Sequence, residues 1–140
     1  MATSTRCGDA TMVLVDTSAW VEFLRDTGSP ACIRVGKLLG AELATCDAIR
    51  MELLAGARNE PHLRDLERLI ARAAHFPMQP GDFDQAAALH RQCRRRGETV
   101  RVLMDCLIGA LAIRADLPVL HWDADFDVLA RHTPLRVDGT

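Results

Sequence analysis

The sequence predicts a single α/β domain in which helices cover both faces of a mainly parallel sheet. Short apolar runs alternate along the chain with longer segments in which apolar residues recur at helical spacing. This alternation favours a parallel sheet, because successive parallel strands need a crossover connection that is usually a helix. With 140 residues, 49% of them hydrophobic, the chain is long enough for one core and too short for two domains.

The chain is expected to enter the domain as a strand followed by two helices. Residues 12–15 are an unbroken apolar run and form the first expected strand. Residues 17–25 carry apolar side chains at helical spacing and form the first expected helix. Gly28 and Pro30 lie in the turn that ends this helix, and the next helix is expected at residues 31–39.

A second strand and two further helices complete the expected first half. The strand is placed at residues 42–46, and Asp47 is the predicted N-cap of the helix after it. The apolar residues of that helix form one stripe, and Glu52 lies at the edge of the stripe. Pro61 opens another helix, which is expected to end at residue 74. Glu52 lies five residues after the predicted N-cap Asp47, inside the expected helix, so it has no capping position to fill.

The second half of the chain repeats the alternation of strands and helices. Strands are expected at residues 75–78, 118–122 and 135–137, and helices at residues 81–96, from Asp105 onward, and at 126–131. The helix that begins at Asp105 is the most hydrophobic in the chain, and the strand that follows it is apolar throughout. Both are therefore expected to be buried.

The remaining composition is typical of a cytoplasmic protein. Residues 1–11 are small and polar and are expected to form a disordered tail before a domain that spans 12–137. There is no apolar signal segment, and no apolar run is long enough to cross a bilayer. The five cysteines lack the C-x-x-C spacing of zinc sites, which favours reduced thiols. The formal net charge is -2, so any contact with nucleic acid must come from a local patch.

Five acidic residues are the candidate functional groups: Asp16, Glu52, Asp105, Asp123 and Asp125. Asp16 and Asp123 each follow a buried strand, and ligand sites of open α/β folds lie at that edge of the sheet. Helix capping is an alternative role for Asp16 and Asp105, but it does not account for Glu52 or for the Asp123 and Asp125 pair. Several carboxylates in one cleft repel one another unless cations lie between them. The sequence therefore predicts a site for hard metal ions.

Four sequence blocks around these acids resemble a known family. The blocks are VLVDTSAW at 13–20, MELLAG at 51–56, LMDCLI at 103–108 and HWDADF at 121–126. Together they resemble the PIN-domain ribonucleases, and most closely the VapC-type toxins of VapBC toxin–antitoxin systems. The resemblance covers residues 12–137. It implies a Rossmann-like three-layer α/β/α PIN domain with a mainly parallel central sheet.

The resemblance also implies an activity, a cofactor and partners. The expected activity is that of a Mg²⁺-dependent endoribonuclease that cleaves RNA phosphodiester bonds by metal-activated water, with Mn²⁺ as a substitute ion. Asp16 and Asp105 are the strongest expected metal ligands. Glu52, Asp123 and Asp125 are expected to complete the catalytic pocket, either as direct ligands or through water. A cognate VapB-like antitoxin, an RNA substrate and a homodimer are the expected partners.

Two alternatives to this function stay open. One is a catalytically silent RNA-binding protein of the PIN fold, in which metal affinity or access has been lost. The other, less favoured, is a Mg²⁺-binding receiver-type signalling domain. Receivers need a lysine after a late strand, and the only lysine here, Lys37, falls in an early expected helix.

Several other side chains near the five candidate acids have both a structural and a functional interpretation. The hydroxyls of Thr17 and Ser18 can orient a carboxylate or cap a helix. Trp20 and Trp122 are expected to pack in the core rather than to stack on bases, because one lies on an apolar stripe and the other ends an apolar strand. The arginine-rich stretch 91–101 is expected either to contact phosphates or to form a solvated helix end.

Overall fold

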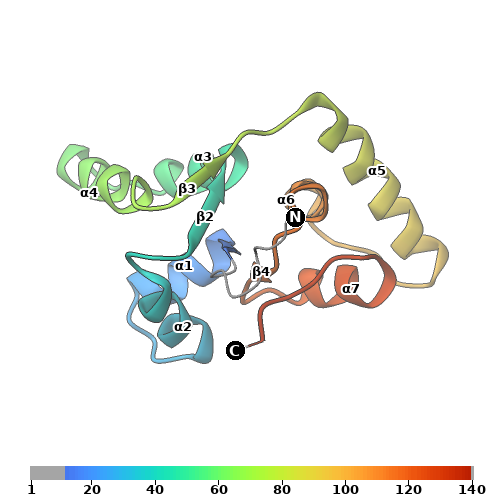
Figure 1. The fold of residues 1–140 in the computed structure, drawn as a ribbon, viewed down its shortest axis with the longest axis horizontal. Coiled ribbons are helices and arrows are strands. Elements are labelled where there is room, and N and C mark those ends of the chain that lie inside the picture. Colours follow the sequence, from blue (N-terminus) through green and yellow to red (C-terminus); the bar gives the residue numbers. More distant parts are fainter. Residues whose placement is uncertain (1–11, 140) are drawn as a thin grey trace, which may run out of the picture.

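The computed structural model describes residues 12–139, which contain a four-stranded parallel sheet and seven helices (Figure 1). The strands are β1 (Val13–Val15), β2 (Leu43–Cys46), β3 (Ala74–Phe76) and β4 (Val119–Leu120). They lie in the order β3-β2-β1-β4, and every neighbouring pair is parallel. The predicted α/β class with a parallel sheet is thereby confirmed. The expected tail at residues 1–11 lies outside the described part of the chain.

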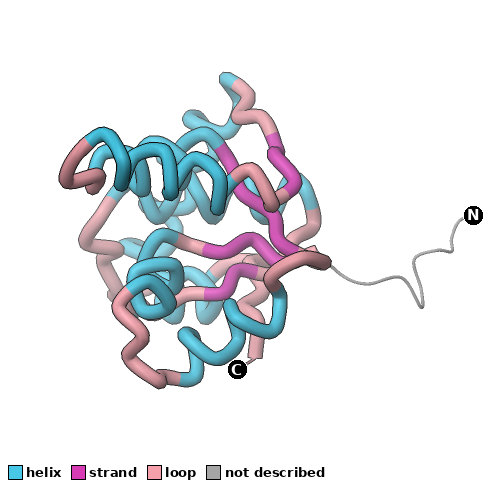
Figure 2. The backbone as a smooth tube through the Cα atoms, turned by 90° about the vertical axis from the view of Figure 1, so that its left-hand side faces the viewer, coloured by secondary structure: helices cyan, strands magenta, loops and turns pink. Residues whose placement is uncertain are grey.

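Helices flank the sheet on both sides. They are α1 (Thr17–Leu24), α2 (Pro30–Leu38), α3 (Asp47–Ala55), α4 (Glu60–Ile70), α5 (Pro80–Arg95), α6 (Leu103–Ala115) and α7 (Ala124–His132). Figure 1 shows α1 and α2 to the left of β4, and α5, α6 and α7 to its right. Figure 2, turned by 90°, shows the strands enclosed between helices. Over residues 12–139, no helix combines the length and the apolar character that crossing a membrane requires.

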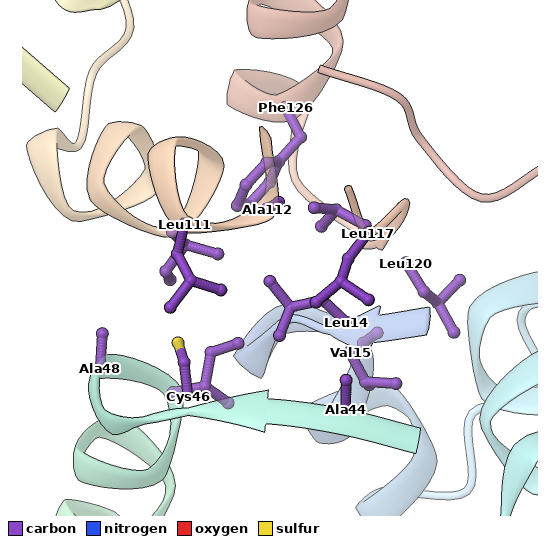
Figure 3. Close-up of a cluster of buried hydrophobic side chains, with 14 of the residues drawn as sticks. Leu14, Val15, Ala44, Cys46, Ala48, Leu111, Ala112, Leu117, Leu120 and Phe126 are labelled. Atoms are coloured by element: carbon purple, nitrogen blue, oxygen red, sulfur yellow. The ribbon is translucent and has the colours of Figure 1, made fainter. Parts of the chain in front are cut away.

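A large part of the core lies between the sheet and α6, and α1 and α2 add buried residues such as Trp20 and Val35. Figure 3 shows Leu14 of β1 and Cys46 of β2 pointing towards Leu111 of α6, with Phe126 of α7 at the top of the same cluster. Residues 105–112 of α6 are all buried, so the predicted burial of the most hydrophobic helix is confirmed. Burial on this scale is what stabilises a sheet of such short strands, since each strand offers few ladder hydrogen bonds of its own.

The last strands are shorter than predicted. β4 ends at Leu120, and the expected strand at 135–137 is reduced to a single bridge between Val119 and Val137. Because β4 has only two residues, it offers few backbone groups with which residues 135–137 could pair. The chain after Leu120 turns away towards α7, and the backbone N–H of Trp122 donates to the hydroxyl of Ser18 rather than to a neighbouring strand. Trp122 is consequently 50% exposed, so its expected place in the core is wrong.

Two predicted helix starts are also corrected. The N-cap of α3 is Cys46, and Asp47 is the first helical residue, where its side chain accepts the backbone N–H of Met78. The helix expected from Asp105 begins at Leu103, with Val102 as its N-cap. Asp105 therefore lies inside the first turn of α6, and its side chain is free for a role other than capping.

Candidate metal centre

Asp16 lies at the carboxyl end of β1, where its backbone N–H donates to the carbonyl of Leu120 in β4 over 2.9 Å. Its side chain is the N-cap of α1 and accepts the backbone N–H of Ser18 at 3.0 Å and the hydroxyl of Ser18 at 2.6 Å, both through Oδ2. The capping alternative for Asp16 is thus correct, and it does not exclude a second role. Burial raises the pKa of Asp16 and outweighs these hydrogen bonds, which lower it, while the charge of Glu52 raises it further.

Asp105 enters the site from the first turn of α6. It is 6% exposed, and its Oδ2 atom is buried without a hydrogen-bond partner among the described residues. Burial raises the pKa of Asp105 to about 9, helped by the charges of Asp16, Asp123 and Asp125. A buried carboxylate in such surroundings stays protonated at neutral pH unless a cation compensates its charge.

Asp123 and Asp125 enter from the connection between β4 and α7. Asp123 is the N-cap of α7 and accepts the backbone N–H of Asp125 at 2.9 Å. Asp125, which is 2% exposed, accepts the backbone N–H groups of Arg101 at 3.2 Å and Val102 at 3.0 Å. Burial raises the pKa of Asp125, but these two N–H groups and the Arg101 side chain outweigh it, so that the pKa lies below the ordinary value. Asp125 is therefore charged at neutral pH.

Three of the carboxylates converge closely enough to share one ion. Oxygen atoms of Asp105, Asp123 and Asp125 all lie within 4.8 Å of one another. Oxygen-only donors suit Mg²⁺ and Mn²⁺ better than softer metals. The unpartnered Oδ2 of Asp105 is the observation that tests the fit, because a buried carboxylate oxygen without a donor has a place for a cation. The residues present fit a hard divalent ion.

Glu52 lies outside this group of three carboxylates. It extends from α3, and the hydroxyl of Thr17 donates to its Oε1 atom over 2.7 Å. Its charge acts on Asp16, yet it is not one of the three converging carboxylates. Three acids, Asp16, Asp123 and Asp125, thus act on Asp105. Glu52 lies at the edge, where it borders a groove that is also lined by Thr17, Arg25 and Arg58.

Arg101 is a member of the site that the sequence did not identify. Its Nε atom lies 3.3 Å from Asp125 Oδ1, and its Nη2 atom lies 3.5 Å from Asp123 Oδ1. The sequence places Arg101 in an arginine-rich stretch, which suggested contact with phosphates or solvent. Its pairing with acids more than twenty positions away depends on tertiary structure, so no local signal was available.

Comparisons of sequence agree with the predicted family. The family model for the PIN domain matches residues 13–132. Ribonuclease VapC11 of Mycobacterium tuberculosis is 48% identical over 129 residues, which cover 89% of this chain and 96% of the relative. A VapC ribonuclease of Mycobacterium bovis matches with the same identity and coverage.

Comparisons of structure find the same fold at low sequence identity. VapBC2 of Rickettsia felis, solved bound to a DNA fragment from its promoter, has a TM-score of 0.73 at 16% identity and covers 91% of this chain and 98% of its own. VapC20 of Mycobacterium tuberculosis, described as a toxin that cleaves the sarcin–ricin loop, has a TM-score of 0.61 at 19% identity, with 89% and 98% covered. With the close sequence relatives, these likenesses confirm the prediction from the four sequence blocks: the chain belongs to the PIN-domain family, in its VapC branch.

Proposed function

We propose that this protein is a Mg²⁺-dependent endoribonuclease and the toxin component of a type II toxin–antitoxin pair. The observation that carries the proposal is Asp105, a buried carboxylate with an unpartnered oxygen beside three further carboxylates. The ribonuclease names of relatives that are 48% identical over most of the chain support the same activity. Membership of the PIN family also removes the receiver-type alternative.

Asp105, Asp123 and Asp125 would hold the ion, and Asp16, whose charge raises the pKa of Asp105, would act on the ion beside them. When bound, a divalent ion of this kind activates water and neutralises charge on a phosphodiester. Mg²⁺ is the proposed ion, and Mn²⁺ has the same preference for oxygen ligands. We assign Glu52 to the outer edge of the pocket, where Thr17 fixes its carboxylate.

The protein's own contribution is to hold these carboxylates in place. Ser18 fixes the orientation of Asp16 through two hydrogen bonds, and two backbone N–H groups fix Asp125. Such fixed charges need no rearrangement during the reaction, which is the main source of electrostatic catalysis. Arg101 reduces the negative charge of the pocket at its exposed side, where an RNA phosphate must approach.

A bound divalent ion would also reduce the repulsion between the carboxylates and the RNA phosphates. RNA phosphates are anionic, so they are repelled by a cluster of carboxylates that holds no cation. A bound divalent ion attracts both groups and therefore joins the substrate to the site. We infer that productive RNA binding and cleavage both depend on the divalent ion.

We further propose a VapB-like antitoxin and a second copy of the chain as protein partners, acting in the cytoplasm. VapBC complexes are among the solved structures that share this fold. The apolar side chains that α1 and α2 leave exposed, Leu24 and Ile33, are the surface we assign to the antitoxin. Leu24 also borders the groove that contains Glu52, so a segment bound there would lie beside the acidic pocket.

The test is RNA cleavage by purified protein that has been freed of any bound partner. Total cellular RNA is incubated with Mg²⁺ or with EDTA, and new RNA ends are mapped by sequencing. Discrete cuts in Mg²⁺ that disappear in EDTA and in Asp105→Asn are the expected result. RNA that is bound but left intact in saturating Mg²⁺ and Mn²⁺ would contradict the proposal and favour the catalytically silent alternative.

A further inference from the structure

Trp122 is the one tryptophan of the chain that reaches the surface. The sequence contains two tryptophans, and Trp20 is fully buried in the core. Trp122 is half exposed because β4 ends at Leu120 and the chain then turns towards α7. Tryptophan is among the most buried residues on average, so its exposure beside a functional site needs a reason.

Two hydrogen bonds tie Trp122 to the acidic cluster. Its backbone N–H donates to Ser18 Oγ at 2.9 Å, and that hydroxyl donates to Asp16 Oδ2 at 2.6 Å. The next residue, Asp123, belongs to the converging carboxylates. The backbone of Trp122 is therefore fixed at the border of the site, and its half-exposed side chain directly precedes the candidate ligand Asp123 in the chain.

The ring borders an open hollow of about 440 Å³. Its main lining residues are His121, Trp122, Asp123, Asp127 and Val137. Both ring nitrogens of His121 are engaged within the protein. Nδ1 accepts the backbone N–H of Asp123 at 3.1 Å, and Nε2 lies 3.4 Å from Asp127 Oδ1. Apart from the indole N–H of Trp122, the remaining polar side chains of the lining are the carboxylates of Asp123, Asp127 and Asp138, and Asp138 is paired with Arg34.

The carboxylates of this hollow favour the binding of a neutral nucleobase over the binding of a phosphate group. Carboxylates repel a phosphate, but they accept hydrogen bonds from the amino group of a nucleobase. An indole face binds any base by stacking. A base packed on Trp122 would therefore have its edge near Asp127, while its backbone continues towards the candidate ion. Asp127 is half exposed, so its second oxygen is accessible to such an amino group.

We propose that Trp122 stacks on the nucleobase next to the scissile phosphodiester, and that Asp127 accepts a hydrogen bond from an exocyclic amino group of that base. The inference rests on the proposed function and adds a substrate-binding residue to it. Stacking fixes the position of the RNA strand. Asp127 gives cytosine, adenine and guanine an advantage over uracil, which has no exocyclic amino group.

The test uses the two tryptophans as reporters. A short single-stranded oligoribonucleotide of mixed sequence is titrated, at a Mg²⁺ concentration high enough to offset the weaker ion binding, into the full chain carrying Asp105→Asn, which prevents cleavage, and intrinsic fluorescence is recorded. Stacking on Trp122 quenches its emission, whereas Trp20 is buried and out of reach of the RNA. We expect quenching that saturates with binding, and no quenching when Trp122→Phe is added.

Affinity is measured in the same background by the fluorescence anisotropy of labelled RNA. We expect Trp122→Leu, which keeps apolar bulk but has no aromatic face, to weaken binding roughly 5- to 150-fold, the usual range for the loss of one base–aromatic stack. Trp122→Phe should restore most of the affinity. Asp127→Ala, which removes the acceptor, should reduce the preference for oligocytidine over oligouridine.

The possible failures are distinguishable. If the RNA binds without quenching, or if Trp122→Leu binds as tightly as the parent, the stacking inference is overturned, while cleavage by wild-type protein leaves the proposed function intact. A Trp122→Leu variant that binds RNA normally but loses affinity for its antitoxin would assign the ring to a protein partner instead. If the parent binds no RNA at saturating Mg²⁺, the stacking inference fails, and the proposed function fails with it only if the wild-type protein also cleaves no RNA. The unfolding temperature of each variant verifies that the fold is retained.

Discussion

The hydroxyl of Ser18 donates to Asp16 Oδ2 over 2.6 Å, and the backbone N–H of the same serine donates to the same oxygen over 3.0 Å. One residue thus fixes the orientation of a buried carboxylate twice. Both bonds favour the charged form of Asp16 and partly offset the rise in its pKa that burial causes. The Ser18 hydroxyl also accepts the N–H of Trp122, so it joins the ends of β1 and β4.

Replacement of this hydroxyl should affect both stability and pH dependence. We expect Ser18→Ala to lower the free energy of unfolding by about 1–3 kcal/mol, because a hydrogen bond to a charged group is lost and the Trp122 N–H loses its acceptor. The pKa of Asp16 should rise further, since a bond that lowers it is removed. The acid limb of the pH–rate profile should therefore move to higher pH. An unshifted limb would contradict the role of Ser18, and Ser29→Ala, at the cap of α2, is the matched control.

Asp105 should make the metal-free protein less stable as pH rises. Its folded-state pKa of about 9 lies above the ordinary value of 3.8, so between these values the folded state holds a proton that the unfolded state has lost. The free energy of unfolding then falls with rising pH across that window. We expect Asp105→Asn to remove this decrease and to raise the unfolding temperature in EDTA near pH 8.

Thermal unfolding in EDTA from pH 5 to pH 9 measures this effect. Asp65→Asn is the control, because Asp65 is an exposed carboxylate on α4 that pairs with Arg68. The control should follow the wild-type curve. Parallel pH curves for wild type and Asp105→Asn would show that Asp105 is already charged in the metal-free protein.

Binding of Mg²⁺ should release a proton at neutral pH. The ion needs Asp105 in its charged form, and the raised pKa keeps that side chain protonated until the ion arrives. We expect titration calorimetry at pH 7, in buffers of different ionisation enthalpy, to report release of about one proton per binding event. Asp105→Asn should bind the ion weakly and release none. Proton-free binding by the wild type would place the ion away from Asp105.

Arg101 should affect substrate and ion in opposite directions. Its exposed guanidinium lies beside Asp123 and Asp125, so Arg101→Gln removes a positive charge that repels a divalent ion and attracts a phosphate. We expect a lower Kd for Mg²⁺ and a higher KM for RNA, with a stability change below about 1 kcal/mol because the pair is largely exposed. The Asp125 carboxylate keeps its two backbone donors in this variant.

Steady-state kinetics at several salt concentrations measure both effects. Arg68→Gln on α4 is the control for the loss of one exposed arginine. If Arg101→Gln and Arg68→Gln change KM equally, the arginine acts through the overall charge of the protein and not through the site.

The order of strands and helices and the family could be predicted from the sequence, because both depend on local patterns. The start of α6 could not. Asp125 accepts the backbone N–H groups of Arg101 and Val102, so a carboxylate more than twenty positions away fixes the two residues before the helix, and the helix begins at Leu103, two residues before Asp105. The prediction of Asp105 as a helix start was wrong for that reason.

The environment of Trp122 was misjudged for a related reason. Its apolar neighbours suggest a buried strand that continues to residue 122, yet the ladder ends where Leu120 accepts the N–H of Asp16. The backbone N–H of Trp122 then donates to the hydroxyl of Ser18, which is 104 positions away in the chain. The sequence identifies the candidate acidic residues. The distances between their oxygens and the exposure of the Trp122 side chain depend on contacts between residues far apart in the sequence, which local patterns do not reveal.

The most direct test of the central claim is the rate of RNA cleavage under single-turnover conditions, compared for wild type, Asp105→Asn and Asp65→Asn at saturating Mg²⁺. The claim that the carboxylates around Asp105 form the catalytic metal centre predicts that Asp105→Asn is slower by roughly a thousandfold or more, since several kcal/mol of transition-state stabilisation is lost, and that Asp65→Asn is unaffected. Cleavage by Asp105→Asn at the wild-type rate would contradict it.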